Sequence, residues 1–349
     1  MRAPVPVLLG CLLFPVLAQA NAPDSANDDV RMQRAAEQLV RSQLPSGLFL
    51  HAYDFDTGEA RAADGLDGVA LVRQSGAAFA LAEYAAHSHH PQSLSAVGRF
   101  LDQAAERSLP VGKGRLQVQL ERTGVYNLPR LWWRARRPLD ALGLLYSDSG
   151  TGLLLSADGT YAQTYVGATA FALIAGLRYR ALSGDDRFDD MIPRWVRGLR
   201  AVHVPGRGFR EAPPYLSESD YLNGQAWLAL ARYAAAYPQD RDMAELLEQL
   251  DTYLLERYRD SASQQFHHWG SMAAALRAAM TGDARFDELV AGLTRAFLAR
   301  NSVTLDANTN TCRVVEVVAS LAGRPESLRG DAALADQVAA WITRMMAQN

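Results

Sequence analysis

Apolar residues recur at intervals of three and four positions in six stretches of the chain, with polar residues between them. After Phe188, for instance, apolar side chains return at Ile192, Trp195, Val196 and Leu199. This spacing places them on one face of an α-helix and predicts helices that bury only that face. The six stretches are 28–43, 91–107, 188–199, 243–254, 286–297 and 331–346.

A second type of stretch is rich in alanine and leucine on every side. A helix without a polar face is typical of a protein interior. Three such runs cover 167–181, 224–236 and 270–280, and each opens with a glycine shortly after an aromatic residue. Two further runs begin near Gly76 and Cys312. The sequence therefore predicts five buried helices that alternate with the one-faced helices.

This alternation is repetitive. The segment 183–189 (SGDDRFD) recurs as 281–287 (TGDARFD), each time between a buried run and a one-faced run. Because one helical hairpin cannot cover its own apolar face, neighbouring hairpins must pack against one another. We expect an all-α fold, a single α/α toroid over residues 21–349. It would have five to six helical hairpins arranged as inner and outer helix rings.

The helical pattern is interrupted at about 111–164, where a small β insertion is expected. Short alternating apolar pieces at 116–120 and 153–155 lie there between glycine and aspartate turns. Residues 48–53, followed by the turn sequence Asp56-Thr57-Gly58, predict another small hairpin.

The first twenty residues predict a signal peptide. A positive charge at Arg2 precedes an apolar run at 4–17, and Ala18-Gln19-Ala20 has the small-x-small form of a signal-peptidase site. We expect the mature chain to begin at Asn21 and the bacterial protein to be periplasmic or secreted, without stable membrane insertion. The alternative is a lipoprotein, because the residues before Cys11 loosely resemble a lipobox.

Composition excludes some functions. The formal net charge is −3, from 35 basic and 38 acidic residues, which argues against a broad nucleic-acid surface. Lys113 is the only lysine, and arginine suits carboxylate recognition, although a bias towards arginine codons explains it equally well. Signal cleavage would remove Cys11 and leave Cys312 alone, so neither an internal disulfide nor a Cys-rich zinc site is expected.

Long loops precede the buried helices, whereas short turns follow them. The loops gather where the inner helices begin, and helix N-termini favour anionic ligands. We call this end of the expected toroid the mouth, and we expect a ligand site there. Its polar and aromatic residues include Tyr53, Arg73, Gln74, Tyr161, Arg207, Arg210, Glu218, Asp220, Tyr221, His268, Trp269, Arg313 and Glu316.

Three of these residues are candidate catalytic groups: Asp220, His268 and Glu316. The candidates for substrate binding are Tyr53, Arg73, Gln74, Tyr161, Tyr221, Trp269 and Arg313. Flat aromatic rings stack on sugars, and carboxylates, amides and arginines bond to hydroxyls or uronate carboxylates.

Structural roles for the candidates stay open. Asp220 would also suit a helix N-cap, and Arg313 and Glu316 an ion pair three residues apart on one helix. His268 would also suit a buried position. No cofactor and no metal are expected, because spacing supplies no third ligand beside the His267-His268 pair.

The motifs at 44–53, 72–77, 165–170, 221–226, 268–269 and 313–316 resemble those of bacterial helical-toroid proteins in the six-hairpin-glycosidase-like superfamily. The resemblance covers about residues 40–320 and implies the α/α toroid. That superfamily includes glycoside hydrolases, polysaccharide lyases and uronate epimerases. Gln225 stands where a glutamate is usual in those proteins.

Two classes of function remain. The first is an exported carbohydrate-active protein acting on an envelope or extracellular polysaccharide or oligosaccharide, either glycoside hydrolase-like or uronate lyase/epimerase-like. Paired carboxylates would serve hydrolysis, and a Tyr or His base with an arginine would serve uronate chemistry. The second is a non-catalytic polysaccharide-binding or assembly module of the cell envelope.

Overall fold

Helices occupy most of the described chain. The computed structural model describes residues 25–50, 52–53, 60–61, 66–114, 119, 146–160, 163–210, 218–261, 263–300 and 331–348. The helices are α1 (Ser25–Arg41), α2 (Gly68–Ser88), α3 (Pro91–Glu106), α6 (Val166–Ser183), α7 (Met191–Val202), α8 (Asp220–Ala236), α9 (Arg241–Tyr258), α10 (Gln264–Thr281), α11 (Ala284–Arg300) and α13 (Ala332–Gln348). The expected signal peptide, residues 1–20, lies outside the described residues.

The chain divides into two compact units. The larger unit covers residues 32–254 and contains α2, α3, α6, α7, α8 and most of α9. The smaller unit contains α10, α11 and α13. The mostly helical composition and the small β elements confirm the all-α class. The toroid arrangement and the single domain stay predictions.

Consecutive helices of the larger unit form hairpins. α2 packs beside α6, and α6 packs beside α8. α3 contacts α2 and α6, and α7 contacts α6. The connections within each hairpin are short, at 89–90, 184–190 and 237–240. The connections leading into α6 and α8, 107–165 and 203–219, are longer. The predicted contrast between short turns and long returns is therefore confirmed for these helices.

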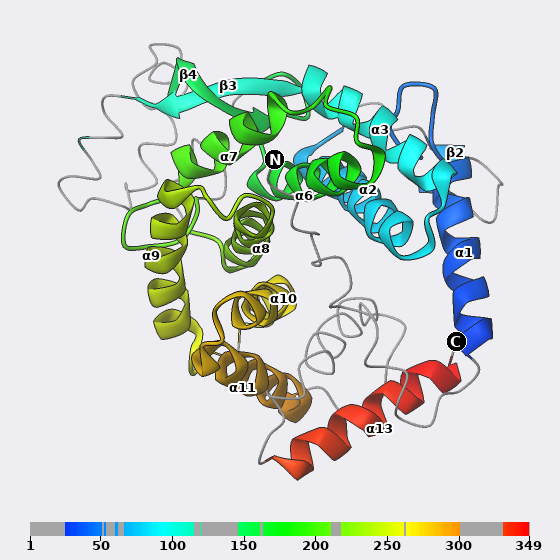
Figure 1. Ribbon diagram of the computed structural model, residues 1–349, viewed down its shortest axis with the longest axis vertical. Helices are drawn as coiled ribbons and strands as arrows, with labels where there is room; N and C mark the ends of the chain where they lie inside the picture. The colour runs from blue at the N-terminus through cyan, green and yellow to red at the C-terminus, as the bar shows by residue number, and fades with distance from the viewer. Residues whose placement is uncertain are drawn as a thin grey trace, which may run out of the picture. The chain divides into compact units, whose positions relative to one another are not determined.

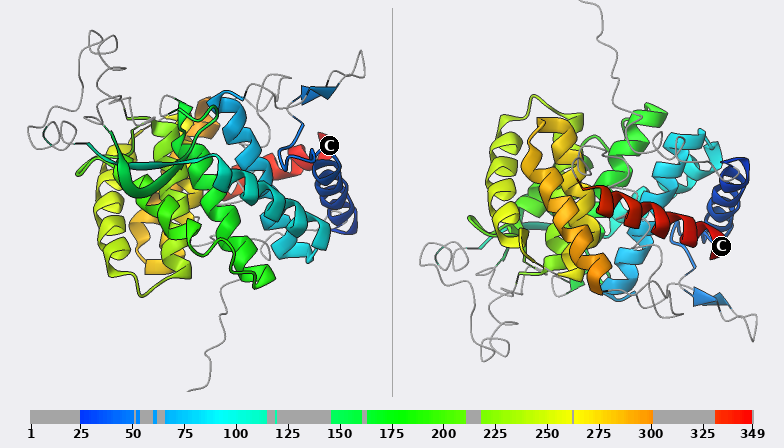
Figure 2. Two further views of the ribbon diagram at one scale, coloured as in Figure 1. Left: turned by 90° about the horizontal axis from the view of Figure 1, so that it is seen from above. Right: turned by 90° about the horizontal axis from the view of Figure 1, so that it is seen from below.

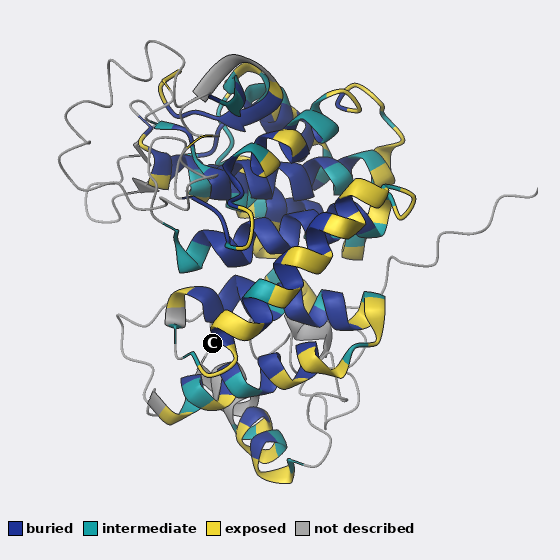
Figure 3. Ribbon diagram, turned by 90° about the vertical axis from the view of Figure 1, so that its left-hand side faces the viewer, coloured by how far each residue is buried: buried dark blue, intermediate teal, exposed yellow. Residues whose placement is uncertain are grey.

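Burial follows the sequence pattern (Figure 3). The helices α6 and α8 are buried on every side over 166–176 and 222–231, whereas α3 and α7 bury one side and expose the other. The helix α2 departs from this rule, because Val69 is 56% exposed and Arg73 and Ala80 are also exposed. It also begins at Gly68, capped by Asp67, and not near Gly76 as its apolar run suggested.

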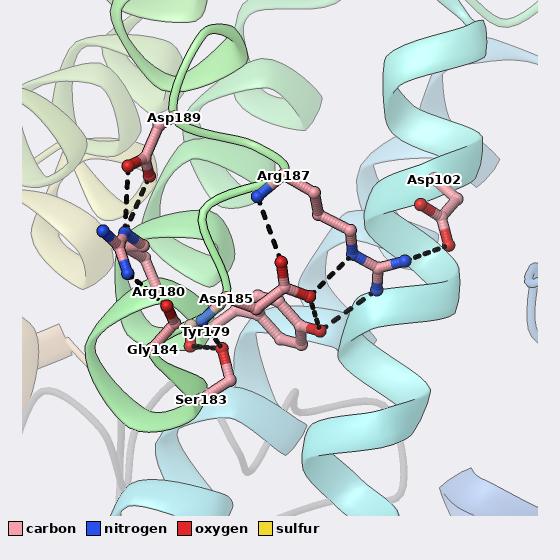
Figure 4. A network of polar contacts seen from close by, with 8 residues as sticks. All are labelled: Asp102, Tyr179, Arg180, Ser183, Gly184, Asp185, Arg187 and Asp189. Atoms are coloured by element: carbon pink, nitrogen blue, oxygen red, sulfur yellow. Dashed lines mark hydrogen bonds and ion pairs between the residues drawn. The ribbon is translucent and has the colours of Figure 1, made fainter.

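The repeated segment 183–189 is a hairpin turn (Figure 4). Gly184 and Gly282 both end their helices with a φ of 71°, which glycine adopts without strain. The hydroxyl of Ser183 accepts a bond from the Asp185 N–H, and Asp185 accepts one from the Arg187 N–H. The same two bonds recur at 281–285. The repeat therefore encodes a turn.

The first copy of this turn is also joined to neighbouring helices. The Arg187 side chain donates to Asp102 of α3 at 3.2 Å and to the Tyr179 hydroxyl at 3.1 Å, and Tyr179 donates to Asp185 at 2.9 Å (Figure 4). The Arg187 N–H, together with the Tyr179 hydroxyl, holds the pKa of Asp185 below its ordinary value. These contacts stabilise the packing of α6 against α3.

Within the described residues, the β strands form two antiparallel pairs. β3 (Ser108–Lys113) pairs with β4 (Tyr146–Leu155), and both lie against α7 (Figures 1 and 2). β1 (Ala52–Tyr53) pairs with β2 (Ala60–Arg61), which confirms the hairpin predicted after residue 48. Within the predicted β insertion, 153–155 is a strand, and 116–120 lies, apart from Gln119, outside the described residues.

The approach of β4 to α7 requires a glycine. A Cβ at Gly198 would overlap the Leu153 carbonyl oxygen, which is main chain and cannot turn away. We expect Gly198→Ala to lower the free energy of unfolding by about 1–3 kcal/mol. Gly76→Ala is the control, because a Cβ there meets nothing within 4 Å and alanine favours a helix by roughly 0.5–1 kcal/mol. Urea denaturation measures both, and equal effects would contradict this packing.

Candidate functional site

The predicted site residues fall into three groups. Tyr161, Arg313 and Glu316 lie outside the described residues, as does Cys312. His268 and Trp269 belong to the smaller unit. The remaining candidates belong to the larger unit: Tyr53, Arg73, Gln74, Asp220 and Tyr221. The common mouth therefore stays a prediction, and each unit has its own geometry.

Gln74 holds the main chain of the preceding loop. It lies inside α2 and is 3% exposed. Its Oε1 accepts a hydrogen bond from the Phe49 N–H at 2.6 Å, and its Nε2 donates to the Phe49 carbonyl at 2.9 Å. Arg73, the next residue back, is exposed, and Tyr53 ends β1. Gln74 thus has an architectural role that its position in a motif did not reveal.

The same arrangement recurs at the starts of α6 and α8. The Thr169 hydroxyl accepts from the Leu155 N–H at 3.0 Å, and Asn223 Oδ1 accepts from the Phe209 N–H at 2.7 Å. Like Gln74, both are buried polar residues. The helices α2, α6 and α8 therefore each use one polar side chain in their first two turns to satisfy the main chain of the segment before them.

Two of the segments held in this way are alike in sequence. Residues 43–49 (QLPSGLF) and 203–209 (HVPGRGF) each form a bridge between their first and last residues. Leu44 and Val204 donate main-chain bonds to Leu48 and Gly208 in equivalent positions. Sequence reasoning missed this repeat, although the spacing of its proline and phenylalanine could have revealed it.

Glu218 is the centre of a polar network at the start of α8. Asn223 Nδ2 donates to Glu218 Oε1 at 2.6 Å. The Tyr253 hydroxyl of α9 lies 3.0 Å from Oε1 and 2.9 Å from Oε2. The main chain of Glu218 also pairs with that of Arg210, whose side chain is 1% exposed. A half-buried carboxylate is thus oriented by an amide and a phenol from two helices.

Asp220, a candidate catalytic group and a candidate N-cap, lies two residues after Glu218. The helix N-cap is Ser219, whose side chain makes no capping bond, and Asp220 is the first residue of α8. A carboxylate in the first turn interacts favourably with the positive end of the helix dipole. Asp220 and Tyr221 are both half-buried. Asn223 and Tyr253 orient the carboxylate of Glu218.

Gln225 lies one turn deeper in α8. Its side chain is fully buried, and neither of its amide atoms has a hydrogen-bond partner among the described residues. Its Oε1 lies against Gly167 of α6, where a Cβ would overlap it. A buried amide without a protein partner is normally satisfied by an ordered water molecule. Gln225 is thus a second fully buried polar side chain near the start of α8, after Asn223.

In the smaller unit, His268 and Trp269 lie inside α10 and not in a loop. The helix begins at Gln264, and Ser263 caps it by accepting a bond from the Phe266 N–H. The two rings stack on each other with centroids 3.9 Å apart, and they are 6% and 7% exposed. This burial agrees with the structural alternative for His268. Among the described residues, no group of His, Cys, Asp and Glu side chains is arranged to hold a metal ion.

Comparison with protein families, curated proteins and solved structures gives no match to this chain. The resemblance to six-hairpin-glycosidase-like proteins therefore stays an expectation from its motifs. Within the described residues, no helix is long and apolar enough to cross a membrane.

The stability of the protein should be sensitive to the replacement of a single side-chain atom of Asn223. The Asn223→Asp variant keeps the Oδ1 atom that accepts the bond from the Phe209 N–H. It replaces the Nδ2 donor, which lies 2.6 Å from Glu218 Oε1, by a second carboxylate oxygen. We expect a loss of about 1–3 kcal/mol at pH 7, with a smaller deficit below about pH 5, where one carboxyl binds a proton. Thermal melts across this pH range measure it.

Asp220→Asn in the same turn is the control for Asn223→Asp. Its expected cost is below about 1 kcal/mol, because asparagine removes the charge but keeps a side-chain oxygen that accepts hydrogen bonds. An Asn223→Asp variant as stable as the wild type at pH 7 would contradict the network around Glu218.

Proposed function

We propose that the protein is an exported bacterial carbohydrate-active protein that acts on an envelope or extracellular polysaccharide or oligosaccharide. Its site would lie at the start of α8, around Glu218. The oriented carboxylate supports this proposal, because Glu218 stands at the end of a long loop and two neutral donors hold it in place. Carboxylates are the acid and base groups of most glycoside hydrolases.

The donors define what Glu218 would do. Hydrogen bonds from Tyr253 and Asn223 fix the orientation of its carboxylate, and a general base or a nucleophile must be held in a fixed orientation towards the substrate. In hydrolysis the carboxylate would activate water or attack the sugar. In uronate lyase or epimerase chemistry, Glu218 would take the phenol proton of Tyr253 while the phenol oxygen accepts the proton next to the sugar carboxylate.

A non-catalytic binding or assembly module is the second candidate. Gln225 favours it, because a neutral amide binds hydroxyl groups but does not transfer protons at pH 7. The buried amide atoms without protein partners would then contribute to recognition of a sugar or of an ordered water.

Oligosaccharide turnover by the purified mature protein tests the proposal. Products would be detected by mass and by the absorbance of unsaturated uronates. We expect Glu218→Gln to lower turnover by roughly 10²–10⁴-fold while the melting temperature stays close to that of the wild type. Tyr253→Phe is the matched variant, since it keeps the ring and removes the donor. Binding without turnover in the wild type would support the second candidate, and neither binding nor turnover would overturn both.

Export is proposed from the signal peptide expected at 1–20. Sequencing the N-terminus of protein from the periplasm or medium should give Asn21 as the first residue. Recovery of acylated Cys11 as the first residue would support the lipoprotein alternative.

A further inference from the structure

A cluster of three charged side chains lies far along the inner helices from Glu218. Glu83 of α2, Arg178 of α6 and Arg232 of α8 are five, five and four residues from the ends of their helices. Arg178 Nε donates to Glu83 Oε1 at 2.8 Å and Nη2 donates to Oε2 at 3.2 Å. Arg232 Nη2 lies 3.7 Å from Glu83 Oε2. We call these three residues the arginine cluster.

The cluster occupies equivalent positions of the repeat. Each member precedes a tyrosine, in the pairs Glu83-Tyr84, Arg178-Tyr179 and Arg232-Tyr233. Tyr179 and Tyr233 each donate to an aspartate of the following turn, which shows that these helices are in the same register. Because α2 and α8 flank α6, contact between Glu83 and Arg232 means that the side chains converge over one face of α6.

Charge in the cluster is not balanced. Two guanidinium groups face one carboxylate, and Arg232 Nε has no hydrogen-bond partner among the described residues. The Arg232 side chain is only 14% exposed, and desolvation lowers its pKa despite the opposing charge of Glu83. A positive charge held mostly out of water is costly unless an anion compensates it. One further negative charge would satisfy the cluster.

We propose that Arg232, assisted by Arg178, binds the carboxylate of an acidic sugar. The planar Nε–Nη edge of an arginine matches the two oxygens of a carboxylate, and one unbalanced positive charge matches one negative charge. A singly charged carboxylate matches this excess of one positive charge better than a doubly charged phosphate does. That the carboxylate belongs to a sugar rests on the proposed function.

Titration calorimetry on the mature chain tests this assignment, with glucuronate as the probe, glucose as the uncharged sugar and acetate as the bare carboxylate. We expect glucuronate to bind at least about tenfold more tightly than glucose or acetate. Arg232→Gln should weaken glucuronate binding by about tenfold or more, and Arg232→Lys should restore it only partly, because lysine lacks the planar edge. Arg180→Gln is the control, since Arg180 is on the same helix as Arg178 but pairs with Asp189.

Each result is decisive. Wild-type glucuronate affinity in Arg232→Gln would overturn the site. Equal binding of acetate and glucuronate would overturn the acidic-sugar assignment, and equal binding of glucose would overturn any role for the charge. The variant Arg232→Gln keeps the paired Glu83 and Arg178, so it should fold. A further outcome is glucuronate binding that depends on Arg232, without turnover of any oligosaccharide. It would contradict only the enzymatic form of the proposed function.

Discussion

Replacing Trp195 by alanine is expected to lower the free energy of unfolding by about 3–5 kcal/mol, among the largest effects for a single side chain in this protein. Trp195 is fully buried in α7, and its ring lies against Gly176 of α6. Its Nε1 donates to Ser108 Oγ of β3 at 2.9 Å. Two effects would lower the stability: the substitution leaves a large cavity, and it removes the hydrogen bond between α7 and the β3–β4 pair.

Trp195→Phe separates these two contributions. Phenylalanine keeps most of the apolar area but cannot donate to Ser108, so we expect a loss of only about 1–2 kcal/mol. Chemical denaturation of both variants, followed by circular dichroism, gives the comparison. If Trp195→Ala cost less than about 1 kcal/mol, α7 would not pack against α6 and β3 as described.

Glu83→Gln is the second substitution with a large expected effect. It leaves Arg178 and Arg232 close together without their carboxylate, and breaking such a largely buried pair costs about 3–5 kcal/mol. Arg232→Gln should cost much less, because the Glu83–Arg178 pair that remains is neutral overall. Urea denaturation at pH 7 distinguishes these results, and equal losses would contradict the unbalanced charge of the arginine cluster.

The stabilisation from Glu83 should depend on pH. Burial raises the pKa of Glu83, but the charge of Arg232 and the bond from Arg178 outweigh it, so the pKa lies below the ordinary value of 4.5. A carboxyl with a lowered folded-state pKa stabilises the fold fully above its unfolded-state value and loses this contribution as pH falls through the folded-state value. The stability difference between wild type and Glu83→Gln should therefore stay constant above about pH 5.5 and shrink below pH 4.5.

Much of the secondary structure could be predicted from periodicity. The one-faced runs at 91–107 and 243–254 match α3 and α9, and the runs at 167–181 and 224–236 match the buried helices α6 and α8. These predictions succeeded because the spacing of apolar residues along a helix is a local property. The repeated turn was equally local, since its glycine, hydroxyl and aspartate satisfy one another within seven residues.

The starts of two helices were predicted less well. The glycines at 76 and 270 suggested helix starts, but α2 begins at Gly68 and α10 at Gln264. Their first turns are set by the capping residues Asp67 and Ser263, which lie upstream of the apolar runs. Because a cap acts on only a few N–H groups, it leaves a much weaker signal in the sequence than a buried face does.

The sequence by itself determined the order of helices, their buried faces and the turns within hairpins. The tertiary structure decided which polar residues meet. Gln74 lies in a predicted ligand motif, and only the structure shows its amide bonded to the Phe49 main chain. No pattern in the sequence pairs Glu83 with Arg178, which lies 95 residues away. Helical periodicity concerns neighbours on one helix, whereas these contacts depend on which helices pack together and in which register, and this is decided by the burial of whole apolar faces.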